Sequence, residues 1–250
     1  MIEKLIGDLR RAIENTTGRS HPAADRRFHK HDEYLSYGLK TSDFRQILKA
    51  LLPHFLKLSL KERLNAAAQL LGKHVGELGH IGIHLVALSV NELKPYHFPL
   101  LDRLLDDFRS WSHVDHFCSE VMQPLLWKYR DETLALVQEW NQAPIRWKRR
   151  ASVVIFTRKV GESGEFTDEA LRLCENLIWD KEDIVQKGVG WALKDNMRSS
   201  QKNVLPFVKH LRRLGVSSTI TLYAIRDLKD SERNEVLSIR KELQSNLKKK

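Results

Sequence analysis

Apolar residues recur every three to four positions along almost the whole chain. The pattern is clearest in five segments: FRQILKALLPHFLKL, KERLNAAAQLLGKHV, DETLALVQEWNQ, EALRLCENLIW and NVLPFVKHLRRL. Such spacing places the apolar side chains on one face of an α-helix. Strand-like alternation is nearly absent; the ambiguous stretch SSTITLYAI is also expected to be helical because its neighbours are. The pattern predicts an all-α protein.

Short breaks rich in Gly, Pro or polar residues separate the helices: TTGRSHPAADRR, ELKPYHFP, QAPI and VGESGEF. They recur about every 40 residues, which is the period of paired-helix HEAT or armadillo repeats. Stacked repeats of this kind form a curved solenoid with a concave groove. We therefore expect one HEAT-like-repeat domain over residues 1–240 and a basic C-terminal tail over residues 241–250. A generic helical bundle is the alternative.

The charge is unevenly distributed. The chain carries 42 Lys and Arg against 32 Asp and Glu, a net charge of +10, and residues 126–250 hold 25 of the bases and 17 of the acids, or +8. A basic excess in one half of a protein favours a polyanionic partner, most often nucleic acid and less often a membrane surface or ribosome. We expect the concave groove to be basic.

The cysteines and the apolar stretches bear on the compartment. Cys118 and Cys174 form no metal-spaced or redox motif and lie in apolar helical patterns, so buried thiols in a reducing environment are expected. The stretch IGIHLVALSV is too short to span a bilayer, and the amphipathic N-terminus lacks the apolar core of a signal peptide. We expect a soluble intracellular protein, cytoplasmic and, in a prokaryote, associated with the nucleoid.

Three stretches could carry chemistry: RSWSHVD, IRWKRRASVVIFTRK and QKGVGWALK. In the first, Trp111 and Asp115 are four residues apart and so share one helix face. The second concentrates four cations just before an apolar run. In the third, Gly188 and Gly190 precede Trp191; glycine inside a helix costs about 1 kcal/mol relative to alanine, so close approach of a helix or ligand is expected there.

The spacing between these stretches links them. Trp111 and Arg150 are 39 residues apart, and Arg150 and Trp191 are 41 apart. In a solenoid of that period, equivalent positions recur on the same face of successive repeats. We therefore expect both tryptophans, Arg150 and Asp115 to converge on one patch.

The segments SWSHVD, WKRRASVVIF and QKGVGWALK together resemble the AlkD-like DNA alkylation repair enzymes. That family consists of HEAT-like-repeat DNA glycosylases that remove N3- and N7-alkylated purines from duplex DNA. The resemblance implies that Trp111, Asp115, Arg150 and Trp191 line the lesion site. YGLKTSDFRQILK resembles the DNA-contacting segment of the family, which carries over Lys40, Thr41 and Arg45. Residues 74–100 match poorly, and where members often have basic residues in the last repeat, this chain has SSTITLYAIRD, with Arg226 as its single base.

The expected chemistry suits these residues. A purine alkylated at N3 or N7 is cationic, so its glycosidic bond is already labile, and cleavage leaves positive charge on the sugar. Asp115 would stabilise that charge, Trp111 and Trp191 would stack on the deoxyribose, and Arg150 would bind the nearby phosphate. Arg158 and Lys194 are expected to extend the track of backbone contacts.

Several residues and the function itself also have simpler explanations. A non-catalytic HEAT-like scaffold that binds nucleic acid or protein is the rival function. His80 and His84 have a spacing that can bind metal, but partly buried histidines are expected because no third ligand accompanies them. The remaining tryptophans are predicted to be structural: Trp127, Trp140, Trp147 and Trp179. We predict no metal and no cofactor, and a monomer that binds duplex DNA containing alkylated purines.

Overall fold

The computed structural model describes residues 2–26, 34–229 and 231–239 and is almost entirely helical there. Its contacts divide the chain into two compact units, Met1–Thr133 and Leu134–Lys250. The prediction of an all-α fold is confirmed, whereas the HEAT-like solenoid, its concave groove and the single domain over residues 1–240 stay predictions. The predicted basic tail, residues 241–250, lies outside the described residues.

The first unit is built from helices and one two-residue strand pair. Its elements are α1 (Ile2–Thr17), β1 (Ala23–Ala24), β2 (Leu35–Ser36), α2 (Thr41–Leu56), α3 (Leu60–Leu71), α4 (Gly76–Ala87), α5 (Phe98–Leu104), α6 (Trp111–Phe117) and α7 (Gln123–Lys128), with 3₁₀ turns at Pro95–His97 and Leu105–Asp107 and a π-helical turn at Cys118–Met122. The next helix, α8 (Arg130–Asn141), contains the boundary between the units.

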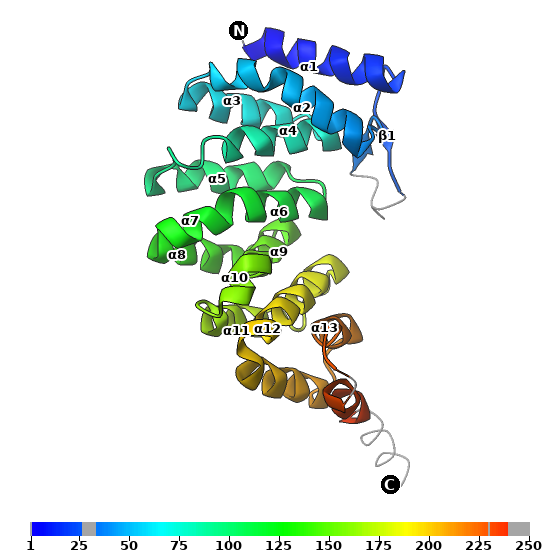
Figure 1. Ribbon diagram of the computed structural model, residues 1–250, viewed down its shortest axis with the longest axis vertical. Helices are drawn as coiled ribbons and strands as arrows, with labels where there is room; N and C mark the ends of the chain where they lie inside the picture. Colours follow the sequence, from blue (N-terminus) through cyan, green and yellow to red (C-terminus); the bar gives the residue numbers. More distant parts are fainter. Residues whose placement is uncertain (1, 27–33, 230, 240–250) are drawn as a thin grey trace. The chain divides into compact units, whose positions relative to one another are not determined.

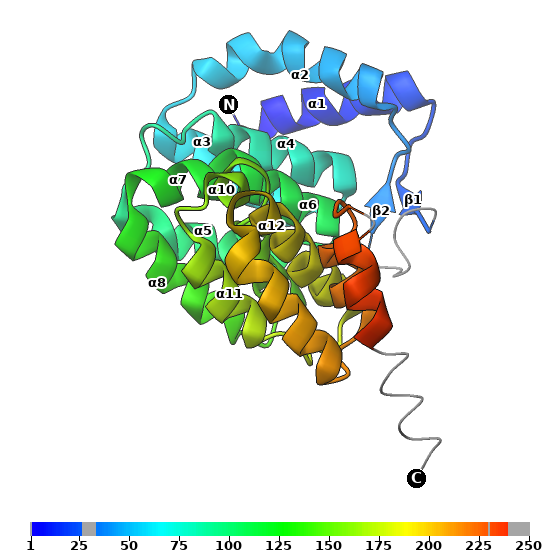
Figure 2. The ribbon, with the colours of Figure 1, turned by 60° about the horizontal axis from the view of Figure 1, so that its bottom comes forward.

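Small residues let the helices of the first unit pack closely. A Cβ atom built on Gly82 of α4 would lie 2.9 Å from the carbonyl oxygen of Ala67, so α3 and α4 approach backbone to backbone there. The strands β1 and β2 pair antiparallel, with Ala24 opposite Leu35. Figures 1 and 2 both show α1 and α2 as neighbours with the β1–β2 ribbon at one end of them.

The second unit is centred on one long helix. Its elements are α9 (Arg146–Val154), α10 (Arg158–Ser163), α11 (Thr167–Glu175), α12 (Asp183–Arg213) and α13 (Ser218–Ala224), and residues 231–239 are also helical. Ser200 has non-helical dihedral angles (φ −135°, ψ 47°), so α12 is bent. Figure 1 shows the yellow and gold halves of α12 running in different directions.

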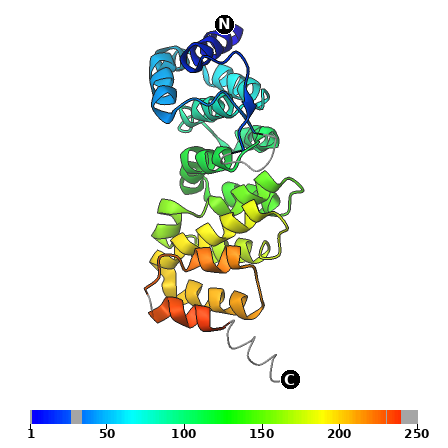
Figure 3. The ribbon, with the colours of Figure 1, turned by 90° about the vertical axis from the view of Figure 1, so that its right-hand side faces the viewer.

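The ambiguous stretch SSTITLYAI forms α13, and the prediction of a helix is confirmed. In Figure 3, α13 (orange) lies between the two halves of α12. A Cβ atom on Gly190 would lie 2.7 Å from Tyr223 Cβ and 3.0 Å from the carbonyl oxygen of Ile220. Gly188 allows α9 to pack closely in the same way. A Cβ atom built on it would lie 3.3 Å from Val153 Cγ2 and 3.4 Å from Arg150 Cγ. Both glycines are therefore explained by neighbouring helices.

Some of the residues that were predicted to be structural lie in the buried core. Cys118 and Cys174 are both buried, as predicted, and neither forms a disulfide. Trp140 and Trp147 are also buried. Trp127 and Trp179, in contrast, are 45% and 63% exposed, and their assignment as structural residues stays a prediction. A helical apolar pattern marks a face, but the side chains of neighbouring elements decide how far that face is covered.

His80 and His84 are half-buried, as predicted. Burial lowers the pKa of His84, and the charge of Glu120 opposes that shift. No group of three or more His, Cys, Asp or Glu within the described ranges is arranged to hold a metal ion. No helix in the same part of the chain has both the length and the apolar character needed to cross a membrane.

Candidate functional site

Helix α6 presents Trp111 and Asp115 one turn apart. Ser110 caps the helix, because its Oγ accepts a hydrogen bond from the backbone N–H of Ser112 at 3.0 Å. The helix therefore begins at Trp111, and the four-residue spacing places Asp115 on the same side. Both side chains are partly exposed. Neither side chain is sealed in the core.

The opposite side of α6 is anchored to α4, which fixes the rotation of the helix. The Nε2 atom of His113 lies 3.0 Å from the carbonyl oxygen of Gly76, a pairing in which the ring nitrogen donates. His80 contacts α6 at two further points: its Nε2 lies 3.1 Å from Ser112 Oγ, and its Nδ1 lies 3.1 Å from Nδ1 of His116. These anchors leave the Trp111 and Asp115 side of the helix as the one presented away from α4.

The backbone directly after Asp115 is irregular. Residues Cys118–Met122 form a π-helical turn, and Ser119 Oγ donates to the carbonyl oxygen of Asp115 at 2.9 Å. Single π-helical turns inside helices are frequent at functional sites. Periodicity analysis cannot find such a turn, since the apolar spacing through it still fits a helix.

A cleft of about 370 Å³ opens beside α6, between the first turns of α2 and α4. Thr41, His80 and His116 contribute to its lining, as does Tyr34. Burial, followed by the negative charges of Glu77 and Asp25, raises the pKa of Tyr34 to about 12. The phenol is therefore neutral and can donate a hydrogen bond at physiological pH.

In the second unit, Arg150 is buried, with only 4% of its surface exposed. One guanidinium nitrogen donates to the carbonyl oxygen of Ile184 in the first turn of α12 at 2.6 Å. The aliphatic stem lies against Gly188, as described above. Arg150 thus joins α9 to α12, and its predicted contact with a phosphate stays a prediction.

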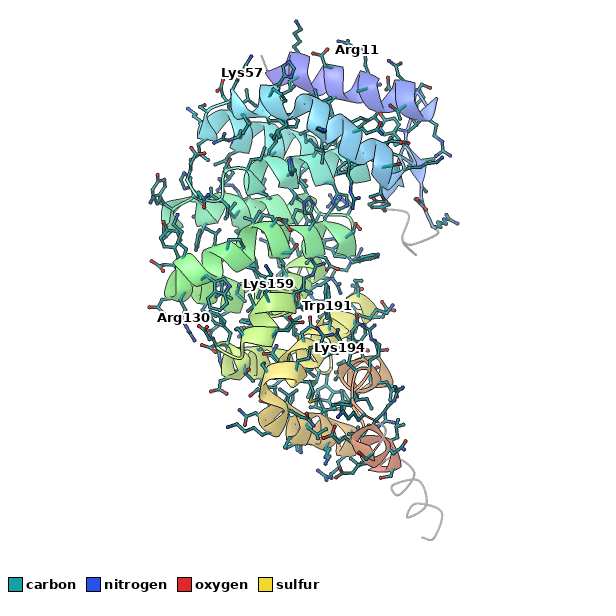
Figure 4. All side chains as sticks on the ribbon, viewed as in Figure 1. Arg11, Lys57, Arg130, Lys159, Trp191 and Lys194 are labelled. Carbon is teal, nitrogen blue, oxygen red and sulfur yellow. The ribbon has the colours of Figure 1, made fainter. Side chains whose placement is uncertain are left out.

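Trp191 is partly exposed on the first half of α12 (Figure 4). The guanidinium carbon of Arg158 lies 5.4 Å from the centroid of its ring, within the range of a cation–π interaction. The structure therefore brings together two residues that were predicted from separate motifs. Arg158 has a positive φ of 53°, which is uncommon for a residue with a side chain and clusters at functional sites.

Asp195, which none of the sequence motifs singled out, holds Arg158 in this conformation. Its Oδ2 accepts the backbone N–H of Arg158 at 2.6 Å, and its side chain is almost fully buried. The signal was present in the sequence, because Asp195 follows Trp191 by four residues just as Asp115 follows Trp111. Burial separates the two acids: Asp195 is an internal anchor, whereas Asp115 is partly exposed.

Lys194 requires a correction. It was expected to extend the DNA backbone track, but it is only 6% exposed, and Figure 4 shows it in the first half of α12. Its Nζ lies 2.8 Å from Asp195 Oδ1 and 3.3 Å from Asp227 Oδ2. Hydrogen bonds from Arg198 and Lys194 lower the pKa of Asp227, so this carboxylate stays charged. Lys194 is therefore a buried cation paired with the buried Asp195 and the exposed Asp227.

The predicted DNA-contacting segment begins α2. Lys40 is the capping residue with extended dihedral angles, and Thr41 is the first residue of the helix. Lys40, Thr41 and Arg45 are exposed. Because Thr41 and Arg45 are four residues apart, they share one face of the helix.

A comparison with protein families now identifies the group. The family described as DNA alkylation repair enzyme matches residues 9–228. The chain belongs to the DNA alkylation repair enzyme family. A solved structure described as a predicted DNA alkylation repair enzyme from Enterococcus faecalis has a similar fold, with a TM-score of 0.70 and 15% identity over 79% of this chain and 90% of that chain. No curated protein matches the chain.

Membership supports a role in the repair of alkylation damage in DNA. The structure groups the predicted residues in two pairs, Trp111 with Asp115 on α6 and Trp191 with Arg158 on the α10 and α12 helices. The convergence of all four central residues on one patch stays a prediction.

Proposed function

We propose that this member of the family is a DNA glycosylase that hydrolyses the N-glycosidic bond of N3- and N7-alkylated purines in duplex DNA. The observation that carries the proposal is the partly exposed pair of Trp111 and Asp115, one turn apart on an anchored helix. A carboxylate beside an aromatic face suits a substrate that becomes more cationic at its sugar during the reaction. The reaction is a hydrolysis of alkylation damage in base excision repair and leaves an abasic site.

The chemistry follows from the charge on the lesion. A cationic purine leaves without prior protonation, and the deoxyribose takes on positive charge as the C1′–N bond breaks. Asp115 stabilises this charge and orients the attacking water. Each indole stacked on the sugar adds about 0.5–2 kcal/mol through its attraction for the cation. No metal or other cofactor is needed for these steps.

The remaining residues bind the DNA backbone. Arg150, which is 4% exposed, contacts the phosphate near the lesion by releasing the carbonyl oxygen of Ile184. Arg158, already over the ring of Trp191, neutralises a second phosphate. A second segment, at the start of α2, binds the duplex backbone through Lys40, Thr41 and Arg45. Lys194 supports α12 from within and has no part in the contact. We propose that the protein acts as a monomer inside the cell, where duplex DNA is available.

A scaffold that binds DNA without catalysis is the second candidate, favoured by two observations. Helix α13 carries no Lys or Arg, although family members often have basic residues in the last repeat. Lys194 is occupied by carboxylates. Both observations reduce the number of backbone contacts available, and neither concerns Trp111 or Asp115.

The test is release of methylated purine from methylated duplex DNA. Wild type is expected to release it, and Asp115→Asn to slow release at least tenfold, which corresponds to about 1.4 kcal/mol of transition-state stabilisation. Asp131→Asn, an exposed aspartate on α8, is the matched control and should react like wild type. Equal rates for Asp115→Asn and wild type would remove Asp115 from the mechanism. Salt-sensitive DNA binding without release would establish the scaffold.

A further inference from the structure

Glu77, in the first turn of α4, holds the loop that precedes α2. It is a buried carboxylate, 7% exposed, and its oxygens accept four hydrogen bonds from the loop. The donors are Ser36 Oγ at 2.8 Å, and the backbone N–H groups of Tyr37 at 3.2 Å, Gly38 at 3.0 Å and Leu39 at 3.1 Å. A buried charge is tolerated only when it is satisfied in this way.

The geometry of the loop explains why three successive N–H groups reach one carboxylate. Gly38 has a φ of 76°, in the left-handed region that favours glycine, and Ser36 Oγ also accepts its N–H at 2.8 Å. Backbone turns of this kind gather successive N–H groups into a concavity that binds an anion. Here the anion is supplied by the protein itself, from an element about 40 residues away in the chain.

The anchored loop leads directly into the predicted DNA-contacting segment. Leu39 donates to Glu77, and the next residue, Lys40, caps α2. Lys40, Thr41 and Arg45 are exposed, so their positions depend on where and at what angle α2 begins. Glu77 is therefore hydrogen-bonded to the residue directly before Lys40, the first cation of the segment, and fixes the backbone that carries it.

We propose that Glu77 is a positioning residue for DNA binding, which sets the start of α2 so that Lys40, Thr41 and Arg45 face the DNA backbone together. The proposal rests on the function proposed above, since it assumes that this segment contacts DNA. The binding surface itself consists of basic and polar residues. Glu77 lies beneath it and acts through the loop, without touching DNA.

The variant that tests this role is Glu77→Gln. Glutamine has the same size but offers one acceptor oxygen, and its amide group would point donors at the donors of the loop. Glu62→Gln is the matched control: Glu62 also accepts a hydroxyl and a backbone N–H, from Ser59, but in the capping box of α3. Both changes remove a hydrogen-bonded carboxylate, and only the first one releases the loop before α2.

Binding to an undamaged duplex is measured over a range of salt concentrations. Glu77→Gln is expected to weaken binding about tenfold and to make the salt dependence shallower, as for the loss of about two phosphate contacts, while Glu62→Gln binds like wild type. In the double variant with Arg45→Ala, the two losses should not add, because both act through the same segment. Amide hydrogen exchange at residues 37–39 should accelerate in Glu77→Gln alone.

Three results would overturn the proposal: a folded Glu77→Gln that binds like wild type, losses that add fully with Arg45→Ala, or unchanged exchange at residues 37–39. If Glu77→Gln does not fold, Gly38→Ala disturbs the same loop from the other side, since alanine disfavours the φ of 76°, and it is judged by the same readouts. A wild type that binds no DNA refutes the proposed function itself, whereas binding that Glu77→Gln leaves unchanged refutes only the positioning role.

Discussion

Trp111 differs from Trp140 and Trp147 in the side of its helix that it occupies. Trp140 and Trp147 are buried, while Trp111 lies on the side of α6 away from His80 and His113 and is partly exposed. Partial exposure alone does not mark a binding residue, since Trp127 and Trp179 are 45% and 63% exposed. At the scale of single residues, the feature that sets Trp111 apart is the carboxylate of Asp115 one turn away on the same helix face.

A second acid shows how a charge can serve structure instead. Asp227 is bound by Arg198 at 2.6 Å and contacted by Lys194, and both lower its pKa. Because the folded pKa is depressed, the stabilisation is complete above the unfolded value of about 3.9 and is lost as the pH falls through the folded value.

Asp227→Asn is therefore expected to lower the urea midpoint of unfolding at pH 6 and to have less effect as the pH is lowered from 4 to 3. The hydrogen bond from Arg198 is the largest cause of the shift, so the pH-dependent difference should shrink in an Arg198→Met background. A constant difference across this range would mean that the carboxylate is not stabilised by its partners.

At the scale of elements, α12 is the support of the second unit, and its glycines decide how closely α9 and α13 approach. Gly190→Ala is expected to cost about 1–3 kcal/mol, because the new Cβ would meet Tyr223 Cβ at 2.7 Å and a backbone oxygen at 3.0 Å. Gly7→Ala in α1 has no atom within 4 Å of the new Cβ and should gain up to about 1 kcal/mol.

Urea unfolding of the two variants measures the contrast directly. Equal stability of Gly190→Ala and Gly7→Ala would contradict the close contact between α12 and α13. The same contact explains why SSTITLYAI is a helix in spite of its β-branched residues: tertiary packing against α12 overrides local propensity.

At the scale of the whole molecule, the net charge of +10 has to be divided between exposed cations and those used internally. Arg149 is bound to Asp180, and Lys194 to Asp195 and Asp227. Such pairs add nothing to the field that attracts DNA, whereas Lys40, Arg45 and Arg158 are exposed.

The salt dependence of DNA binding separates the two groups. Arg45→Ala is expected to reduce the slope of log affinity against log salt by about 0.9, the value for one phosphate contact. Lys194→Met should leave the slope unchanged and lower the free energy of unfolding by about 3–5 kcal/mol, because it leaves a buried carboxylate without its cation. A shallower slope for Lys194→Met would return this residue to the DNA-contacting surface.

The sequence by itself determined what depends on local spacing. The helical period predicts the all-α fold and the shared face of Trp111 and Asp115, because a helix fixes which residues lie one turn apart. The helix in SSTITLYAI followed from its helical neighbours and not from its own pattern. The family motifs supplied a chemistry for that face. Residue type does not locate the cap of α2, since threonine is a favoured cap residue but Lys40 occupies the position before Thr41.

Tertiary structure decided what each charge does. Asp115 and Asp195 follow a tryptophan at the same distance, yet one is partly exposed and the other anchors the backbone of Arg158. Lys194 looks like a DNA contact in sequence, and its neighbours make it an internal cation. Spacing along one helix cannot reveal what a second helix brings against it, and the cost of burying a charge depends on those partners alone.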